Sequence, residues 1–106
     1  MKFIYKNTKL DLINYSSFYK KLKGLMFKKE PIKNAYLFKR CSSIHTFFMK
    51  QNIDVIITDK DYKVLLIKAN VPKNRIITCK KGFYTFELPL GTVKNIKINT
   101  KIKIED

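Results

Sequence analysis

Two adjacent segments rich in β-branched and aliphatic residues constrain the fold of this chain more than any other feature. They run from Ile53 to Thr58 and from Tyr62 to Lys68, and the short polar stretch Asp59-Lys60-Asp61 joins them. This arrangement predicts a β-hairpin with a tight turn. Because both faces of both segments carry apolar residues, we expect two central strands that are covered on either side.

Other short apolar segments predict more strands around this hairpin. They are residues 2–5, 35–38, 44–49, 75–79 and 83–88, and a last segment in which Ile96, Ile98, Ile102 and Ile104 share one parity and lysines the other. Residues 70–74, which include Pro72, are expected to form a loop. The last segment is predicted to be a strand with one apolar face and one wet face.

One helix is predicted near residues 16–26, after the candidate N-caps Ser16 and Ser17. Its apolar side chains fall at helical spacing, and they are Phe18, Leu22, Leu25 and Met26. A short helical turn is expected near residues 89–95. The prediction is therefore a single mainly β (α+β) domain over residues 1–106, either a small β-sandwich or a partly open barrel.

The length of the chain limits its organisation and its location. It has 106 residues, 45% of them hydrophobic, which is enough for one packed domain but not for two. Its apolar runs are far shorter than the roughly 20 residues of a spanning helix, so we expect no transmembrane segment. The N-terminal residues 1–6 lack the apolar core of a signal peptide. We therefore expect a cytoplasmic protein.

The net charge of +15 would attract nucleic acid, an anionic membrane or an acidic polymer. Codon bias in an A/T-rich genome offers another explanation, because Lys, Ile, Asn, Tyr and Phe are all abundant. The 21 lysines against 2 arginines favour a solvated coat, since specific readers of phosphate and base edges use the arginine fork. If an anionic partner does bind, its expected surface is the densest basic cluster: Lys20, Lys21, Lys23, Lys28 and Lys29.

Three titratable residues are candidates for chemistry. His45 is the only histidine, and its ordinary pKa near neutrality suits general acid–base catalysis. Asp54 and Glu87 each interrupt an apolar segment, where a carboxylate is costly unless it is paired. The functional interpretation is a cleft lined by these three residues. The structural interpretation, which we prefer, makes each acid a hydrogen-bond anchor and predicts that Asp54 is buried and bonded to backbone or to a basic side chain.

The cysteines and the glycines give little support to metal or cofactor chemistry. Cys41 and Cys79 are the only two cysteines, and we expect free thiols rather than a disulfide. Cys41 and His45 have the spacing of half a metal site, but a second pair of soft ligands is missing, so no zinc site is predicted. No phosphate-binding glycine loop is present, and no cofactor is predicted.

Three motifs in order resemble those of the DUF192 family of uncharacterised prokaryotic proteins, over roughly residues 17–104. The first is Lys23-Gly24-Leu25-Met26-Phe27, and the third places Glu87 four residues before Gly91. The second is an aromatic-aromatic-Met segment that leads into an Ile-Asp-Val strand. The residues that carry the resemblance are Gly24, Leu25, Met26, Phe27, His45, Phe47, Phe48, Met49, Ile53, Asp54, Asp59, Glu87 and Gly91.

The resemblance implies a compact, mainly β domain and no established reaction, cofactor or substrate. The chain departs from the family pattern at Lys23, where arginine is usual, and at Asn34-Ala35 and Asn99-Thr100, which replace glycine-containing turns. We therefore expect a non-enzymatic binding or accessory module. One alternative is a small enzyme or ligand-binding protein with a cleft near His45, Asp54 and Glu87. A second is a weak, non-specific binder of nucleic acid or of an anionic surface.

Overall fold

The computed structural model of the chain describes residues 1–14, 30–39, 43–46 and 49–106. Nine strands and one short 3-10 helix are formed within these ranges, so the predicted mainly β architecture is confirmed. The elements are β1 (Lys2–Tyr5), β2 (Thr8–Asn14), β3 (Ala35–Lys39), β4 (Ser43–His45), β5 (Ile53–Thr58), β6 (Val64–Val71), β7 (Ile76–Thr78), β8 (Tyr84–Leu88), η1 (Thr92–Asn95) and β9 (Lys103–Glu105).

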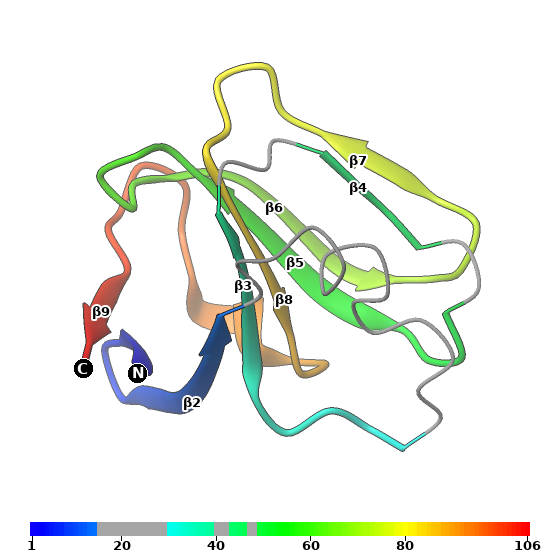
Figure 1. Cartoon of the computed structure of the whole chain (residues 1–106), viewed down its shortest axis with the longest axis horizontal. Coiled ribbons are helices and arrows are strands. Elements are labelled where there is room, and N and C mark those ends of the chain that lie inside the picture. The colour runs from blue at the N-terminus through cyan, green and yellow to red at the C-terminus, as the bar shows by residue number, and fades with distance from the viewer. Residues whose placement is uncertain (15–29, 40–42, 47–48) are drawn as a thin grey trace.

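Seven of these strands form one sheet in the order β6-β5-β8-β3-β2-β1-β9. All neighbours are antiparallel except β2 and β3, which run parallel. The sheet curls, so that β1, β2 and β9 lie on one side of the molecule and the connection from β6 to β7 lies on the other (Figure 1). The result is a half-barrel rather than a flat sheet.

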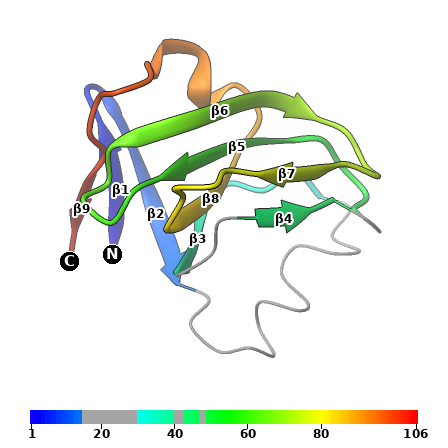
Figure 2. The same ribbon diagram turned by 90° about the horizontal axis from the view of Figure 1, so that it is seen from above.

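The curled sheet has an apolar core on each face. The inner core lies inside the curl and includes Phe3, Leu37 and Phe86, with Val93 of η1 packed against them. The outer core lies on the opposite face and includes Tyr36, Val55 and Ile77. Because Ile77 belongs to the two-stranded sheet of β4 and β7, that small sheet covers the outer face (Figure 2).

β5 is a central strand, as predicted, and all six of its residues are buried. Its odd-numbered residues face the outer core and Ile56 faces the inner core. The prediction for its hairpin partner is only half right, because β6 forms the edge of the sheet and residues 68–70 are exposed. β6 also continues to Val71, into residues that were predicted to be loop.

Other sequence predictions need correction. β2 was not predicted, although Leu10 and Leu12 alternate with polar residues there. The predicted C-terminal strand is reduced to β9, and Ile98 is 47% exposed in the turn that precedes it. The helical turn near 89–95 is present as η1. The predicted helix near 16–26 lies outside the described residues.

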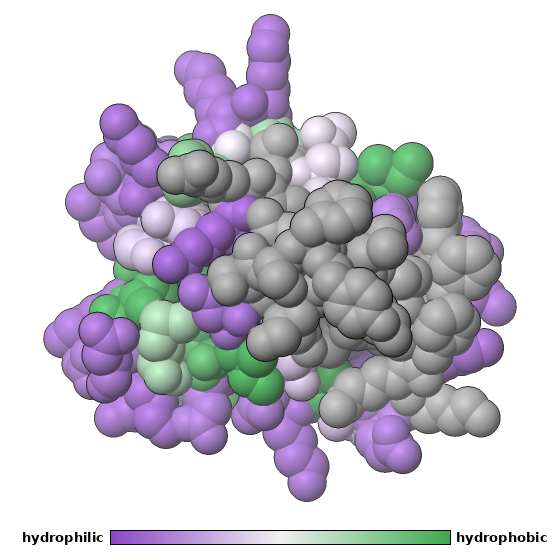
Figure 3. Space-filling view, in the orientation of Figure 1, coloured by the Kyte–Doolittle hydropathy of each residue, from purple (hydrophilic) through white to green (hydrophobic). Residues whose placement is uncertain are grey.

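In the view of Figure 3, hydrophilic side chains project along much of the edge of the described surface, with smaller hydrophobic patches between them. Only two ion pairs are formed within the described ranges, Lys2 with Asp11 and Lys103 with Glu105. Among the residues described, no helix has the length and apolarity that crossing a membrane requires.

Candidate functional site

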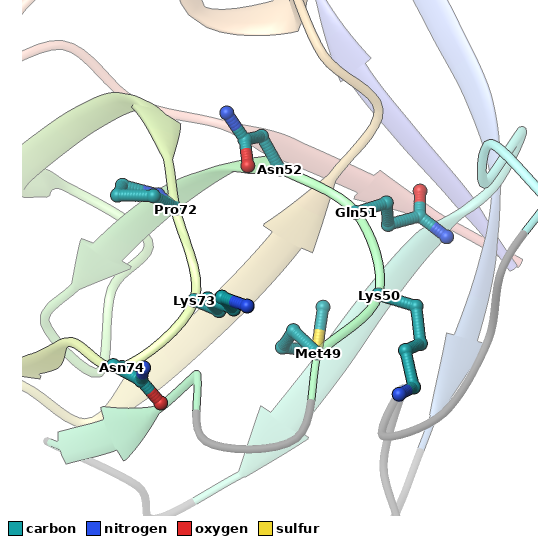
Figure 4. A pocket seen from close by; sticks show the side chains of 7 residues that line it. All are labelled: Met49, Lys50, Gln51, Asn52, Pro72, Lys73 and Asn74. Carbon is teal, nitrogen blue, oxygen red and sulfur yellow. The ribbon is translucent and has the colours of Figure 1, made fainter.

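A pocket of about 610 Å³ lies between the segment that leads into β5 and the loop that joins β6 to β7. Residues 49–52 form one wall and residues 72–74 form the other (Figure 4). The first wall belongs to the second family motif, between the aromatic pair and the Ile-Asp-Val strand. The residues that line the pocket are Met49, Lys50, Gln51, Asn52, Pro72, Lys73 and Asn74.

Thr46 holds the two walls together, although it does not line the pocket. Its hydroxyl donates to the carbonyl of Pro72 at 2.7 Å and accepts the N–H of Arg75 at 2.8 Å. Its own carbonyl accepts the N–H groups of Met49, at 3.2 Å, and of Asn74, at 3.3 Å. A residue that is 1% exposed therefore fixes both loops relative to each other.

The amide side chains of Gln51 and Asn52 attach the first wall to its surroundings. Gln51 Oε1 accepts the N–H of Ile32 at 3.0 Å, and its Nε2 donates to the carbonyl of Glu30. Asn52 Nδ2 donates to Asn70 Oδ1 on β6 at 2.8 Å. Because these contacts connect the wall to two other segments, residues 30–32 and β6, the shape of the wall does not depend on its own short sequence alone.

Each wall of the pocket contributes one lysine and one apolar residue. Of the seven described residues that line it, two are lysines and none is Asp, Glu, His or Cys. Lys73 and Met49 extend toward each other across the opening (Figure 4). Met49 is only 5% exposed and joins the outer core, so the floor is a thioether and Pro72 supplies a further apolar surface. Within the described ranges neither Lys50 nor Lys73 forms an ion pair with a carboxylate.

Asp54 lies on the inner face of β5, where it is 1% exposed. Its Oδ1 accepts the N–H of Asn70 at 2.9 Å, and its Oδ2 accepts the N–H of Val93 at 3.1 Å. The prediction of a buried acid bonded to backbone is confirmed. The carboxylate joins β5, β6 and η1, and this is the arrangement of a structural anchor.

Glu87 is also buried, with 6% of its surface exposed, but its side chain has a different environment from that of Asp54. It lies opposite Tyr36 and Val55, which are members of the outer core. Its side chain is buried and its Oε2 has no hydrogen-bond partner. Burial raises the pKa of Glu87 to about 8. Oε2 therefore makes no anchoring hydrogen bond within the described part of the chain, and the raised pKa favours the protonated form of the carboxyl group at neutral pH.

The structure does not bring His45, Asp54 and Glu87 into one cleft. Asp54 pairs with Leu88 and Glu87 with Val55, so the two carboxyl groups lie on opposite faces of the sheet. His45 is an exposed residue at the end of β4, paired with Ile76 of β7. The register of β5 and β8 therefore contradicts the alternative of a catalytic cleft formed by these three residues.

The remaining described motif residues have structural surroundings. Asp59 Oδ1 accepts the N–H groups of Lys63 and Asp61, both at 2.9 Å, and these bonds hold the pKa of Asp59 below its ordinary value. Ile53 is fully buried, and Gly91 has a φ of 91° immediately before η1. Gly24, Leu25, Met26, Phe27, Phe47 and Phe48, together with the cluster Lys20, Lys21, Lys23, Lys28 and Lys29, lie outside the described residues.

The described part of the chain contains no group of three or more His, Cys, Asp and Glu residues placed to hold a metal ion. Cys79 is a free, half-buried thiol against the outer core, and Cys41 lies outside the described residues.

Sequence reasoning missed the residues that form the pocket. Thr46 and Gln51 carry no recognisable local pattern, because their roles depend on contacts between segments about 20 to 30 residues apart. The one available signal was the position of Met49 to Asn52 inside the second motif. Polar residues between an aromatic segment and a buried strand indicate a loop that approaches another part of the fold.

The protein is a small, mainly β domain, built from a curled sheet that carries a cationic surface pocket. The chain belongs to the DUF192 family, described as uncharacterised ACR, which matches residues 3–105. The resemblance inferred from the three motifs is therefore confirmed.

Proteins similar to this chain occur in archaea and in bacteria. It is 34% identical over 85 residues to the UPF0127 protein PH1112 of Pyrococcus horikoshii, a match that covers 76% of this chain and 74% of that protein. It is also 34% identical over 89 residues to the UPF0127 protein TK1120 of Thermococcus kodakarensis, covering 77% of this chain and 55% of that protein.

A crystal structure of a protein of unknown function from Novosphingobium aromaticivorans is similar in fold. Its TM-score is 0.82 with 17% identity, and the match covers 97% of this chain and 82% of that protein.

Proposed function

We propose that this protein is a non-enzymatic binding module, and that its pocket between residues 49–52 and 72–74 takes a small organic anion. The observation that carries the proposal is that Lys50 and Lys73 both line one pocket whose described lining contains no acid, with the Lys73 side chain extending into the opening (Figure 4). Two ammonium groups without a carboxylate partner favour an anionic ligand, because it supplies the missing counter-charge.

The rest of the lining restricts the chemistry of that ligand. Lysine is a flexible point charge rather than a planar fork, so it suits a single carboxylate as well as a larger anion. Met49 and Pro72 offer an adaptable apolar surface beside the charges. We therefore infer a small carboxylate that carries a short apolar portion. The described lining residues supply charge and contact area but no His, Cys, Asp or Glu side chain, which supports binding rather than catalysis.

A titration with hexanoate, followed by ¹H–¹⁵N correlation spectra, tests this proposal. We expect saturable shifts of the backbone amides at residues 50–52, 73 and 74, with smaller shifts for neutral hexanamide. The double variant Lys50→Gln/Lys73→Gln should bind hexanoate at least about tenfold more weakly, equivalent to about 1.4 kcal/mol. The matched control is Lys60→Gln/Lys80→Gln, which removes the same charge from two exposed turns. Equal weakening by both double variants would contradict a local site.

Thr46 provides a second, independent test, because it positions the walls without touching the pocket. Thr46→Val removes the hydroxyl that bonds Pro72 and Arg75, whereas Thr46→Ser keeps it. We expect Val, but not Ser, to weaken hexanoate binding, while a circular dichroism spectrum shows that both variants stay folded. Unchanged affinity in a folded Thr46→Val protein would show that the pocket does not depend on this connection.

A further inference from the structure

A second hollow, of about 370 Å³, shares no lining residue with the pocket of Figure 4. The turn between β1 and β2 forms one side of it, and η1 with the residues that follow forms the other. β1 and β2 lie at the opposite side of the molecule from the β6–β7 connection in both ribbon views (Figures 1 and 2). The two sites are therefore physically separate.

Three lysines from three different positions surround this hollow. Lys6 lies in the β1–β2 turn, Lys94 in η1, and Lys97 in the segment after it. All three are exposed, and none of the described lining residues is Asp or Glu. The ion pairs formed in the described ranges, Lys2–Asp11 and Lys103–Glu105, do not involve them. Asn7, Asn95, Thr8 and Thr92 add polar groups to the same lining.

The backbone holds Lys6 in a conformation that its residue type does not favour. Its φ is 51°, in the left-handed region that turns normally give to glycine or asparagine. Its ammonium lies 5.7 Å from the centre of the Tyr5 ring, within reach of a cation–π interaction. Strained positions of this kind concentrate at functional sites, so the use of lysine here is informative.

Tyr5 connects the two sides of the hollow. Its ring is buried in the inner core, and its Oη accepts the N–H of Lys97 at 3.4 Å. A hydrogen bond with the Thr100 side chain lowers the pKa of Tyr5, and the bond from Lys97 and the charges of Lys6 and Lys97 lower it further. These contacts show that the phenol lies in a positive environment that the fold maintains.

We propose that Lys6, Lys94 and Lys97 form a second anion site, which binds the phosphoryl group of a phosphorylated small molecule. Three lysines that line one hollow match a multiply charged tetrahedral anion better than a single carboxylate, and the amide side chains of Asn7 and Asn95 in the same lining can bond its oxygens. The pocket of Figure 4 also has amide side chains in its lining, but it has two lysines rather than three and an apolar floor. This inference does not depend on the function proposed for that pocket.

Titration with pyrophosphate at constant ionic strength, followed by ¹H–¹⁵N correlation spectra, tests the site. We expect saturable shifts at residues 6, 7, 94 and 97, with little effect from chloride. The triple variant Lys6→Gln/Lys94→Gln/Lys97→Gln should bind at least tenfold more weakly. The charge-matched control Lys60→Gln/Lys80→Gln/Lys81→Gln should bind as the unmodified protein does. Non-saturable shifts, or equal weakening by the control, would show a diffuse positive field and overturn the proposal.

A single substitution separates binding from structure. Lys6→Asn introduces a residue that tolerates the left-handed conformation. The melting temperature of this variant should therefore equal or exceed that of the unmodified protein. Its affinity for pyrophosphate should nevertheless fall. A folded Lys6→Asn protein with unchanged affinity would overturn the role of Lys6. An oligonucleotide that binds these residues more tightly than pyrophosphate would overturn the assignment to a small molecule.

Discussion

The buried carboxyl group of Glu87 predicts a specific dependence of stability on pH. Its pKa is raised from 4.5 to about 8 in the folded protein, and burial is the cause. Between these values the folded state holds a proton that the unfolded state has lost. The contribution of Glu87 to stability is therefore fully present below pH 4.5, falls as pH rises, and levels off above about pH 8.

The size of the effect follows from the shift. Each pKa unit corresponds to about 1.4 kcal/mol, so the full difference of pKa amounts to about 5 kcal/mol. Between pH 5 and pH 7 the free energy of unfolding should lose about 2–3 kcal/mol because of this one group. Glu87→Gln is a close isostere of the protonated acid that cannot ionise. It should remove this slope, whatever constant offset the buried amide introduces.

The measurement is urea denaturation of both proteins at several pH values from 5 to 9. The difference in the free energy of unfolding between Glu87→Gln and the unmodified protein should grow by about 2–3 kcal/mol from pH 5 to pH 7. Exposed Glu30 supplies the control, because Glu30→Gln should change stability by less than about 0.5 kcal/mol at each pH. A difference for Glu87→Gln that stays constant over this range would refute the reasoning.

Three further predictions concern other residues. Asp54→Ala leaves the N–H groups of Asn70 and Val93 without their acceptor. Chemical denaturation should therefore show that the free energy of unfolding falls by about 1–3 kcal/mol. A fall of less than about 0.5 kcal/mol would contradict the anchor role. Gly91→Ala should lower the free energy of unfolding by about 1–2 kcal/mol through backbone strain alone, since φ is 91° and nothing lies within 4 Å of the added Cβ. An unchanged melting temperature would contradict this. Any binding of DNA or RNA should be weak, independent of nucleotide sequence and steeply reduced by salt. Replacing Lys20, Lys21 and Lys28 by Glu should abolish this binding in fluorescence anisotropy. Tight binding of one sequence at physiological salt would instead show a specific nucleic-acid-binding protein.

The sequence predicts a strand best where the pattern of apolar side chains is compatible with only one position in the sheet. β5 combines β-branched residues with apolar residues on both faces, so its pattern is consistent only with a central, covered strand. The adjacent β6 has a similar composition, yet it lies at the edge of the sheet. Composition alone does not distinguish the two, because the position of a strand in the sheet depends on which distant segment pairs with it.

β2 was missed for a local reason. The turn that separates it from β1 contains Lys6 and Asn7 between the paired residues Tyr5 and Thr8. A glycine would have indicated a hairpin, but this turn places a lysine at a positive φ instead. The lysine that takes the place of a turn glycine here is also one of the residues that line the second hollow.

Asp54 and Glu87 show where prediction of a site from sequence ends. Both interrupt apolar segments, and both were grouped with His45 on that basis. The antiparallel register then places Asp54 opposite Leu88, and Val55 opposite Glu87. Because successive side chains of a strand point to opposite faces, this offset of one residue sends the two carboxyl groups to different cores. One meets two backbone N–H groups, and the other has an oxygen without a partner. The register between β5 and β8, which neither segment reveals alone, therefore makes one acid a hydrogen-bonded anchor and buries the other where its pKa is raised.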